Sequence, residues 1–178
     1  MLYLVRHTSV DVPQGTCYGQ ADVALASTFE DEATTVKSRL TSICFGAVYA
    51  SPLIRCTKLA QYCGYSSYIE DSRLMEMSFG RWENRLWDSI NDPQLAEWFA
   101  GWKTERTPQG ESFEDVCQRA RAFLREAAQH KQDVLAFTHA GFIRAVWVVL
   151  GIRTPEEAFA TSLKFGEIAS IQLPETCK

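Results

Sequence analysis

Short apolar segments alternate with helix-like segments along this chain of 178 residues. The apolar segments have the length of buried strands, and turn residues or helical patterns follow them. Strands are predicted at Leu2–Val5, within Gly46–Pro52, at Tyr68–Glu70 and at Asp133–Phe137. Helices are predicted at Phe29–Leu40, Arg55–Cys63, Glu111–His130 and Gly141–Leu150. This alternation predicts an α/β fold, a three-layer α/β/α sandwich around a largely parallel, mixed central sheet.

Two stretches depart from this alternation. Leu163–Phe165 and Ile168–Leu173 flank the pair Gly166-Glu167, which predicts a final hairpin. The stretch 73–109 is less regular, rich in tryptophan, and broken by turn signals such as Thr107-Pro108. It predicts a helical, lid-like excursion from one domain that spans 1–178, because this length fits a single domain.

The charge and the cysteines restrict the class of protein. The formal net charge is −4, and no apolar segment is long enough to span a bilayer. Neither nucleic acid nor a membrane is therefore predicted as a partner. No two of the six cysteines form a C-x-x-C pair, which disfavours a zinc or redox motif. Because no secretion signal is visible, we expect reduced thiols in a cytoplasmic protein.

Basic or imidazole side chains stand at three predicted junctions between a strand and a helix. Arg6 and His7 follow the first strand, Arg55 follows the strand within Gly46–Pro52, and His139 precedes the helix that begins at Gly141. The carboxyl ends of parallel strands lie at one edge of a sheet, so we expect these side chains to converge. Guanidinium groups beside a helix N-terminus predict an anion site, and their planar shape suits phosphate oxygens.

Each of these residues, taken alone, has a simpler interpretation. A single arginine at a strand end is most often a solvated charge, and His139 could be a core histidine bonded to backbone. A metal centre of His7, His139 and Glu76 is a further alternative. Arginines at positions 6 and 55 argue against a cation site, and three junctions that agree favour the anion site.

Four motifs in a fixed order resemble the histidine phosphatase superfamily, also called phosphoglycerate-mutase-like. They read LVRHT, SPLIRCTKLA, LMEMSFGRWE and FTHAGFIRA, and together they extend over nearly the whole chain. Two further stretches, CYGQADVAL and TPQGESFEDV, resemble the α-ribazole phosphatase branch of that family. The resemblance implies a phosphoglycerate-mutase-like fold and a phosphoric monoester hydrolase.

The chain departs from the family pattern at several positions. Thr8 stands where the family usually has the glycine of R-H-G, and Phe142 stands where a second glycine commonly follows the late histidine. Asn84 replaces the glycine that commonly follows W-E, and the family's early asparagine is absent. These departures bear on which loop groups complete the expected phosphate cradle.

The resemblance also implies roles for the site residues. His7 would attack phosphorus and form a phosphohistidine, and Glu76 would act as general acid and then as general base. From the residues alone, Glu70, Asp71 and Glu83 compete with Glu76 for that role. The catalytic set is predicted as His7, Glu76, His139, Arg6 and Arg55. The phosphate contacts are predicted as Arg6, Arg55, His139, Thr8 and Ala140.

The branch resemblance implies a substrate, a small-molecule phosphomonoester with no metal or cofactor needed. Hydrolysis of α-ribazole 5′-phosphate in cobalamin lower-loop assembly is predicted. The alternatives are a broad-specificity phosphatase, a phosphoglycerate mutase-like enzyme and an inactive phosphoryl-binding module. Tryptophans in the excursion are predicted to pack on the sheet as a helical stripe, with one or two at the pocket mouth. They are Trp82, Trp87, Trp98 and Trp102.

Overall fold

A computed structural model describes residues 1–173 of the chain. Its central sheet has five strands in the order β4-β3-β6-β1-β7. They are β1 (Leu2–Arg6), β3 (Phe45–Ala50), β4 (Ile69–Glu70), β6 (Asp133–Thr138) and β7 (Ile168–Ile171). The first four run parallel, whereas β7 pairs antiparallel with β1. The predicted mixed, largely parallel sheet is confirmed.

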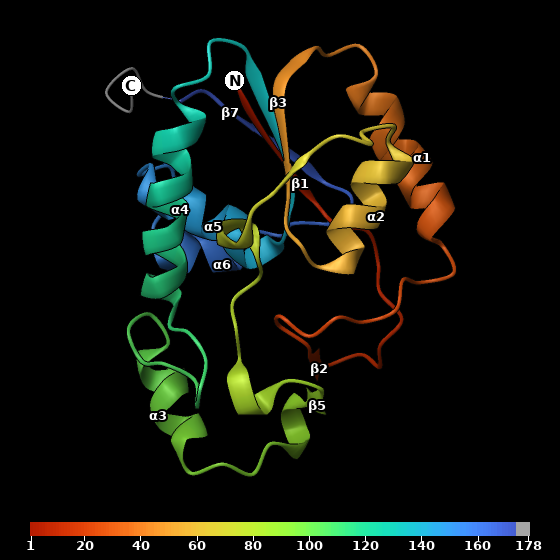
Figure 1. Ribbon diagram of the computed structural model, residues 1–178. Coiled ribbons are helices and arrows are strands. Elements are labelled where there is room, and N and C mark those ends of the chain that lie inside the picture. Colours follow the sequence, from red (N-terminus) through yellow and green to blue (C-terminus); the bar gives the residue numbers. More distant parts are fainter. Residues whose placement is uncertain (174–178) are drawn as a thin grey trace.

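Helices cover both faces of the sheet and make the predicted three layers (Figure 1). One face packs against α1 (Phe29–Leu40) and α2 (Ile54–Tyr62), and the other against α4 (Phe113–Ala127), α5 (Ala140–Val149) and α6 (Pro155–Ala160). Along β1, Leu2 and Leu4 join the α4–α5 side, whereas Val5 joins the α1–α2 side. Successive side chains of a strand point to opposite faces, so a strand covered on both sides is apolar throughout.

A reciprocal hydrogen-bonded cap fixes the start of α4. The Ser112 hydroxyl oxygen accepts from the backbone N–H of Asp115 at 3.2 Å, and the Asp115 carboxylate accepts from the backbone N–H of Ser112 at 2.9 Å. The capping box is therefore complete, with aspartate in place of the usual glutamate. This cap stabilises the N-terminus of α4.

The predicted terminal hairpin is wrong. Only Ile168–Ile171 forms a strand, and its partner is β1 rather than Leu163–Phe165. The backbone N–H of Gly166 donates to the carbonyls of Arg6 and His7, and the N–H of Arg6 donates to Glu167 O at 2.9 Å. The open edge of β1 offers more backbone hydrogen bonds than a three-residue strand would, so the final segment pairs there.

The stretch 73–109 forms short elements, and those that follow η1 (Ser72–Leu74) lie beyond the carboxyl ends of the strands (Figure 1). These later elements are η2 (Gly80–Trp82), β5 (Arg85–Leu86), η3 (Trp87–Ser89) and α3 (Gln94–Gly101). Strand β5 pairs with β2 (Thr16–Cys17) in a small separate sheet. The lid-like behaviour of this stretch, and its place in a single domain over 1–178, stay predictions.

The tryptophans of this stretch pack differently from the predicted stripe on the sheet. Trp82, Trp87 and Trp98 pack with one another and with Phe79, and the rings of Trp87 and Trp98 lie 5.8 Å apart and stacked. Trp102 instead contacts the rings of Phe113 and Phe159, on α4 and α6. The excursion therefore has a small apolar core of its own.

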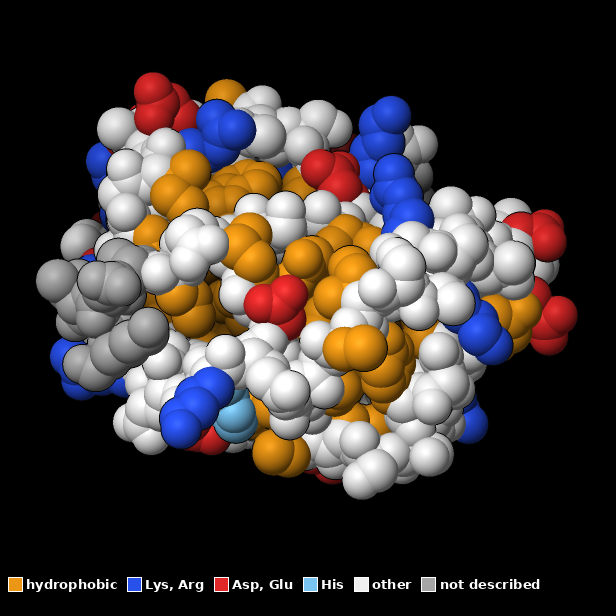
Figure 2. Space-filling model, turned by 90° about the horizontal axis from the view of Figure 1, so that it is seen from above, with side chains coloured by type: hydrophobic (Ala, Val, Ile, Leu, Met, Phe, Trp, Pro, Cys, Tyr) orange, Lys and Arg blue, Asp and Glu red, His pale blue; other side chains and the backbone are white. Residues whose placement is uncertain are grey.

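The opposite end of the molecule, where the strands begin, carries no concentration of one charge. Figure 2 looks down on that end and shows apolar side chains gathered between separate basic and acidic groups. None of the helices in the described part of the chain is long and apolar enough to cross a membrane. The cysteines outside the undescribed tail are free thiols, and Cys177 lies outside the described residues.

Candidate active site

His7 follows β1 directly and is 1% exposed. Its Nδ1 lies 2.7 Å from the carbonyl oxygen of Thr8. A carbonyl only accepts, so Nδ1 carries the proton and Nε2 keeps its lone pair. Burial lowers the pKa of His7 well below its usual range, and the nearby charges of Arg55 and Arg6 act in the same direction. His7 is thereby held as a neutral imidazole with a free nucleophilic nitrogen.

His139 follows β6 and precedes α5, fully buried. Because Arg6 pairs with Thr138 across the parallel strands, the next residues on each strand are also neighbours, and the His7 and His139 rings lie 5.1 Å apart. Arg55 Nε donates to His139 Nδ1 at 3.3 Å, so the other ring nitrogen holds the proton and donates to Ser51 Oγ at 2.8 Å. Burial lowers the pKa of His139, with Arg55 the next cause.

Arg55 lies in the first turn of α2 and is fully buried. Its Nη2 donates to Gly19 O at 2.7 Å and its Nη1 donates to Ala21 O at 2.9 Å. Its guanidinium group also lies 5.2 Å from the ring centre of Tyr18. Carbonyls and a ring solvate this charge without cancelling it, so Arg55 remains a net positive charge next to the two histidines.

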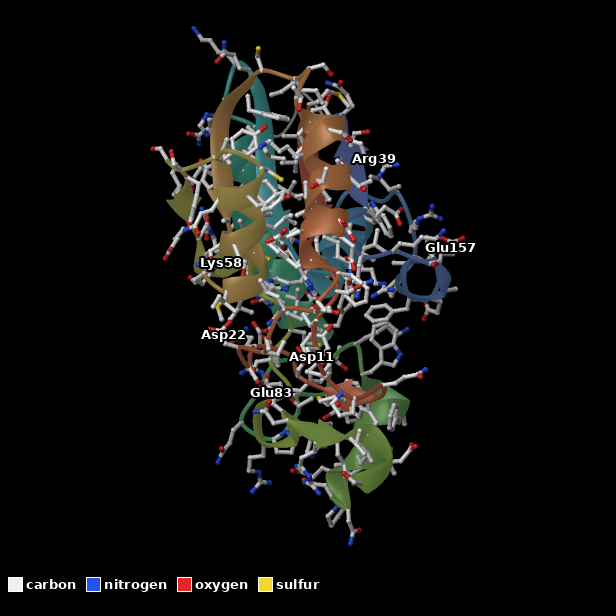
Figure 3. The ribbon with its side chains drawn as sticks, turned by 90° about the vertical axis from the view of Figure 1, so that its right-hand side faces the viewer. Asp11, Asp22, Arg39, Lys58, Glu83 and Glu157 are labelled. Carbon is white, nitrogen blue, oxygen red and sulfur yellow. The ribbon has the colours of Figure 1, made fainter. Side chains whose placement is uncertain are left out.

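The loop that Arg55 contacts is held at both ends. The carboxylate of Asp22 accepts from the backbone N–H of Ile54 at 2.8 Å, at the start of α2, and Glu83 accepts from the N–H of Gln20 at 3.0 Å. Figure 3 shows Asp22 just below α2 and Glu83, which belongs to the excursion, further below. The loop therefore joins α2 to the excursion across the site.

Arg6 ends β1, with its guanidinium carbon 3.8 Å from the ring centre of Phe165. It donates to Leu163 O through Nη1, and its Nε is buried with no hydrogen-bond partner among the described residues. Phe165 belongs to Leu163–Phe165, which was predicted as a hairpin strand and instead forms the turn that places its ring against Arg6. Arg6 and Arg55 take part in no ion pair within residues 1–173.

Glu76 belongs to the segment after η1, and its carboxylate lies against the N-terminus of α5. One carboxylate oxygen accepts from the backbone N–H of Gly141 at 3.2 Å, and the other accepts from the N–H of Met77 at 2.9 Å. A Cβ on residue 141 would lie 2.1 Å from Glu76 Oε1. Glycine at position 141 therefore permits the carboxylate to reach the helix end, a requirement that the motif HAGF did not reveal.

The three carboxylates that compete with Glu76 for the role of general acid lie away from the cavity or are bound by other groups. Glu70 is exposed at the sheet edge, and Asp71 pairs with Arg73 at 2.5 Å. Glu83 accepts from the backbone N–H groups of Phe79 and Gln20. Of these carboxyl groups and Glu76, Glu76 is the one that lines the cavity described next.

A cavity of about 210 Å³ opens over this end of the sheet. Of the residues predicted from the sequence, Arg6, Glu76 and Ala140 line it, whereas His7, Thr8, Arg55 and His139 lie outside its lining. Thr8 is fully buried, with a hydroxyl that has no partner among the described residues. Much of the remaining wall is aromatic, with Tyr18, Phe79, Trp87, Phe113 and Phe159.

Arg144 also lines the cavity, and sequence reasoning missed it. Its Nε donates to Ala158 O at 3.1 Å, and its guanidinium carbon lies 5.1 Å from the ring centre of Phe159. It stands four residues after Ala140, one helical turn further along α5, in the quoted motif FTHAGFIRA. This spacing puts both residues on one helix face and could have identified it.

The hydrogen bonds of His7 and His139 do not favour the alternative of a metal centre with Glu76. No group of three or more His, Cys, Asp or Glu side chains is arranged to hold an ion in residues 1–173. His7 Nδ1 is occupied by a carbonyl, and both nitrogens of His139 are occupied by Arg55 and Ser51. The two guanidinium groups beside these rings suit an anion instead.

Comparisons with known proteins agree with this geometry. The family model "Histidine phosphatase superfamily (branch 1)" matches residues 2–175. A relative named "Putative phosphoserine phosphatase 2", from Hydrogenobacter thermophilus, is 27% identical over 157 residues, which cover 84% of this chain and 77% of the relative. "Probable phosphoglycerate mutase GpmB" from Serratia proteamaculans is 34% identical over 132 residues, 69% of this chain and 60% of that protein.

A solved structure shows the same fold. The protein TTHB049 from Thermus thermophilus superposes with a TM-score of 0.77 at 28% identity, covering 97% of this chain and 93% of that chain. The phosphoglycerate-mutase-like fold is therefore confirmed. Because the family model extends over nearly the entire sequence, the chain belongs to the histidine phosphatase superfamily, branch 1, a family of phosphatases and mutases.

Proposed function

We propose that this chain is a phosphomonoesterase that works through a phosphohistidine on His7. The observation that carries the proposal is the hydrogen bond from His7 Nδ1 to Thr8 O, which leaves Nε2 as a nucleophile. Two guanidinium groups without ion pairs among the described residues, Arg6 and Arg55, lie beside it and match the charge of a phosphate group. An inactive phosphoryl-binding module would have no use for the free nitrogen or for Glu76.

The residues support a two-step displacement. In the first step His7 Nε2 forms a bond to phosphorus, the phosphorus–oxygen bond to the leaving group breaks, and the Glu76 carboxyl group gives its proton to that oxygen. In the second step water attacks phosphorus, Glu76 takes the proton, and the phosphorus–nitrogen bond breaks. Arg6 and Arg55 neutralise charge on the oxygens in both steps.

In this proposal His139 supports the site through its hydrogen bond with Arg55. Both of its ring nitrogens are engaged, by Arg55 Nε and Ser51 Oγ. It therefore orients the Arg55 guanidinium group, and its contact with phosphate requires it to release Ser51. Thr8 and Ala140 remain predicted phosphate contacts, through the free Thr8 hydroxyl and the first turn of α5.

The aromatic wall supports α-ribazole 5′-phosphate as the substrate. The benzimidazole of that molecule is flat and uncharged, and aromatic side chains stack on such a ring. Tyr18, Trp87 and Phe159 line the cavity beside Arg6 and Glu76, where the leaving group would lie. Trp87 is the tryptophan that we propose for the stacking role at the pocket mouth.

One observation favours a second candidate. Arg144 brings a further guanidinium group into the cavity, and it takes part in no ion pair within the described residues. A phosphomonoester with a carboxylate on its leaving group, such as phosphoserine or 3-phosphoglycerate, would match it. The two relatives above are named a phosphoserine phosphatase and a phosphoglycerate mutase, and both named substrates are carboxylated phosphomonoesters.

Phosphate release from a panel of monoesters tests both candidates. We expect kcat/KM to be higher for α-ribazole 5′-phosphate than for phosphoserine, 3-phosphoglycerate or glucose 6-phosphate. A preference for the carboxylated esters that is lost in Arg144→Met would establish the second candidate, and equal efficiency on all four would leave a broad-specificity phosphatase. Transfer of phosphate between phosphoglycerate positions, instead of release, would identify a mutase.

The phosphoenzyme test separates catalysis from binding. We expect acid-labile, base-stable phosphate on the wild-type protein when turnover is quenched, and none on His7→Ala. Substantial turnover by His7→Ala would overturn the proposal.

A further inference from the structure

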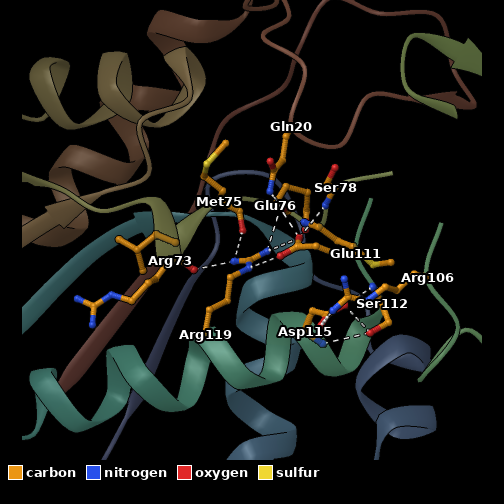
Figure 4. Close-up of polar contacts among 12 residues, drawn as sticks. Gln20, Arg73, Met75, Glu76, Ser78, Arg106, Glu111, Ser112, Asp115 and Arg119 are labelled. Atoms are coloured by element: carbon orange, nitrogen blue, oxygen red, sulfur yellow. Dashed lines mark hydrogen bonds and ion pairs between the residues drawn. The ribbon is translucent and has the colours of Figure 1, made fainter. Parts of the chain in front are cut away.

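Two sequence motifs that the proposed chemistry does not use meet behind Glu76. Gln20 belongs to CYGQADVAL and Glu111 to TPQGESFEDV, and both converge with Arg119 of α4 on the backbone of residues 73–78 (Figure 4). This backbone has no helix or strand from Met75 to Phe79, so secondary structure does not fix the position of Glu76. Side chains from elsewhere must do so.

Arg119 binds three carbonyl groups of this segment. Its Nη1 donates to Arg73 O and Met75 O, both at 2.6 Å, and its Nη2 donates to Glu76 O at 3.1 Å. The side chain is 14% exposed, so water competes little for these bonds. A guanidinium group offers five N–H donors in a fixed plane, whereas a lysine ammonium group offers one donor atom.

Glu111 holds both Arg119 and the far side of the segment. Its two carboxylate oxygens accept from Arg119 Nε at 3.0 Å and Arg119 Nη2 at 3.1 Å. The second oxygen also accepts from the backbone N–H of Ser78 at 2.9 Å. Gln20 Nε2 adds a bond to Glu76 O at 2.8 Å. The segment is therefore bound through carbonyls before and at Glu76 and through an N–H two residues after it.

We propose that Glu111 and Arg119, with Gln20, form a clamp that positions the Glu76 carboxyl group for proton transfer. The clamp holds the backbone from behind, and the N–H of Gly141 binds the carboxylate in front. Proton transfer requires hydrogen-bond distance to the leaving oxygen, and a misplacement of about 1 Å can cost about 100-fold in rate. Glu111, Arg119 and Gln20 are positioning residues. The proposal rests on the proposed function, in which Glu76 is the general acid.

The dependence on the leaving group tests this role. An alkyl leaving group needs a proton as its bond breaks, whereas p-nitrophenolate leaves without one. We expect Arg119→Lys and Glu111→Gln to lower kcat/KM for an alkyl phosphate such as glycerol 1-phosphate by about 10- to 100-fold. The same variants should lower kcat/KM for p-nitrophenyl phosphate by less than about 3-fold, because that constant reports only steps up to loss of the leaving group.

A matched ion pair on the same helix supplies the controls. Arg121 binds Glu114 at 2.9 Å, with side chains 45% and 47% exposed, away from residues 73–78. Arg121→Lys and Glu114→Gln should leave both substrates unaffected. An equal fall on both substrates in the clamp variants, or no fall on the alkyl ester, would overturn the proposal.

Amide hydrogen exchange tests the clamp independently of whether the proposed function is correct. If the wild-type protein hydrolyses neither ester, the proposed function fails while the clamp remains testable. Arg119→Lys should then accelerate exchange at Met77 and Ser78, and Arg121→Lys should not. Unchanged exchange at these two amides would show that the clamp does not hold the segment.

Discussion

The charge state of His7 depends on which side chains surround it. Burial is the largest cause of its lowered pKa, and the Arg55 charge is the next. Arg6 acts in the same direction with a smaller effect, whereas the bond to Thr8 O raises the pKa. These opposing effects leave an imidazole that is neutral and fixed in one tautomer before any substrate arrives. In the proposed mechanism a phosphate group would therefore meet a nucleophile that needs no deprotonation.

We predict that Arg55→Met raises the pKa of His7. Removing a positive charge favours protonation of a nearby imidazole, so the shift is upward. NMR titration of the His7 ring protons measures it directly, with circular dichroism as the control for folding. Arg6→Met should raise the same pKa by less, and an unchanged His7 pKa in Arg55→Met would show that the Arg55 charge does not reach the ring.

The N-terminal turns of α5 contribute three features to the site. Its backbone N–H at Gly141 binds Glu76, its first residue Ala140 lines the cavity, and Arg144 follows one turn later on the same face. The close approach of the Glu76 carboxylate requires that residue 141 lack a Cβ. The geometry of one helix end thus decides whether Glu76, the proposed general acid, reaches the cavity.

We predict that Gly141→Ala separates stability from activity. Alanine favours a helix over glycine by roughly 0.5–1 kcal/mol, so the free energy of unfolding should change little or rise. The added Cβ must displace the Glu76 carboxylate, and kcat/KM for an alkyl phosphate should fall by about 10- to 100-fold. Urea unfolding and kinetics on alkyl and p-nitrophenyl esters measure the two effects. A variant with wild-type kcat/KM on the alkyl ester would contradict the proposed place of Glu76.

The cap of α4 provides a complementary prediction at the scale of an element. Ser112→Ala removes a side-chain acceptor at the helix start and should cost about 1 kcal/mol of unfolding free energy. The loss appears in urea unfolding. Because Arg119 lies two turns further along α4, we expect kcat/KM for p-nitrophenyl phosphate to stay within about 3-fold of the wild-type value.

At the scale of the whole molecule, the fold buries two neutral histidines next to guanidinium groups. Burial lowers the pKa of both His7 and His139. In the unfolded chain both titrate near about 6.5. Above that pH they are neutral in both states, and below it only the unfolded chain takes up their protons. The stability that depends on these groups is therefore present above about pH 6.5 and is lost as the pH falls.

We predict that the free energy of unfolding falls as the pH is lowered from about 6.5 to 5.5. Each histidine that protonates only on unfolding contributes a slope of up to about 1.4 kcal/mol per pH unit. Urea unfolding of the phosphate-free protein at several pH values measures this slope. His7→Asn should make this slope shallower. A free energy of unfolding that is independent of pH in this window would show that His7 and His139 are not held neutral in the folded chain. Bound phosphate should oppose the loss, since it binds only the folded chain.

The sequence by itself determined the order of β1, α1, β3, α2, β4, α4, β6 and α5, and the meeting of Arg6, His7 and His139. Short, continuously apolar strands followed by helices leave few arrangements other than a parallel sheet, and such a sheet brings the ends of its strands to one edge. Residues that directly follow strands are placed by local pattern together with this topology. Their juxtaposition therefore follows without knowledge of any long-range contact.

Only the tertiary structure decided which carboxylate reaches the site, where β7 pairs and what lines the cavity. Glu76 is placed by Arg119 and Gly141, which lie 43 and 65 residues away. The edge of β1 determines the partner of β7, and Phe165 reaches Arg6 only as a result. Local patterns specify which face of an element is buried, but contacts between distant side chains depend on how the faces pack, and that information is spread over the whole chain.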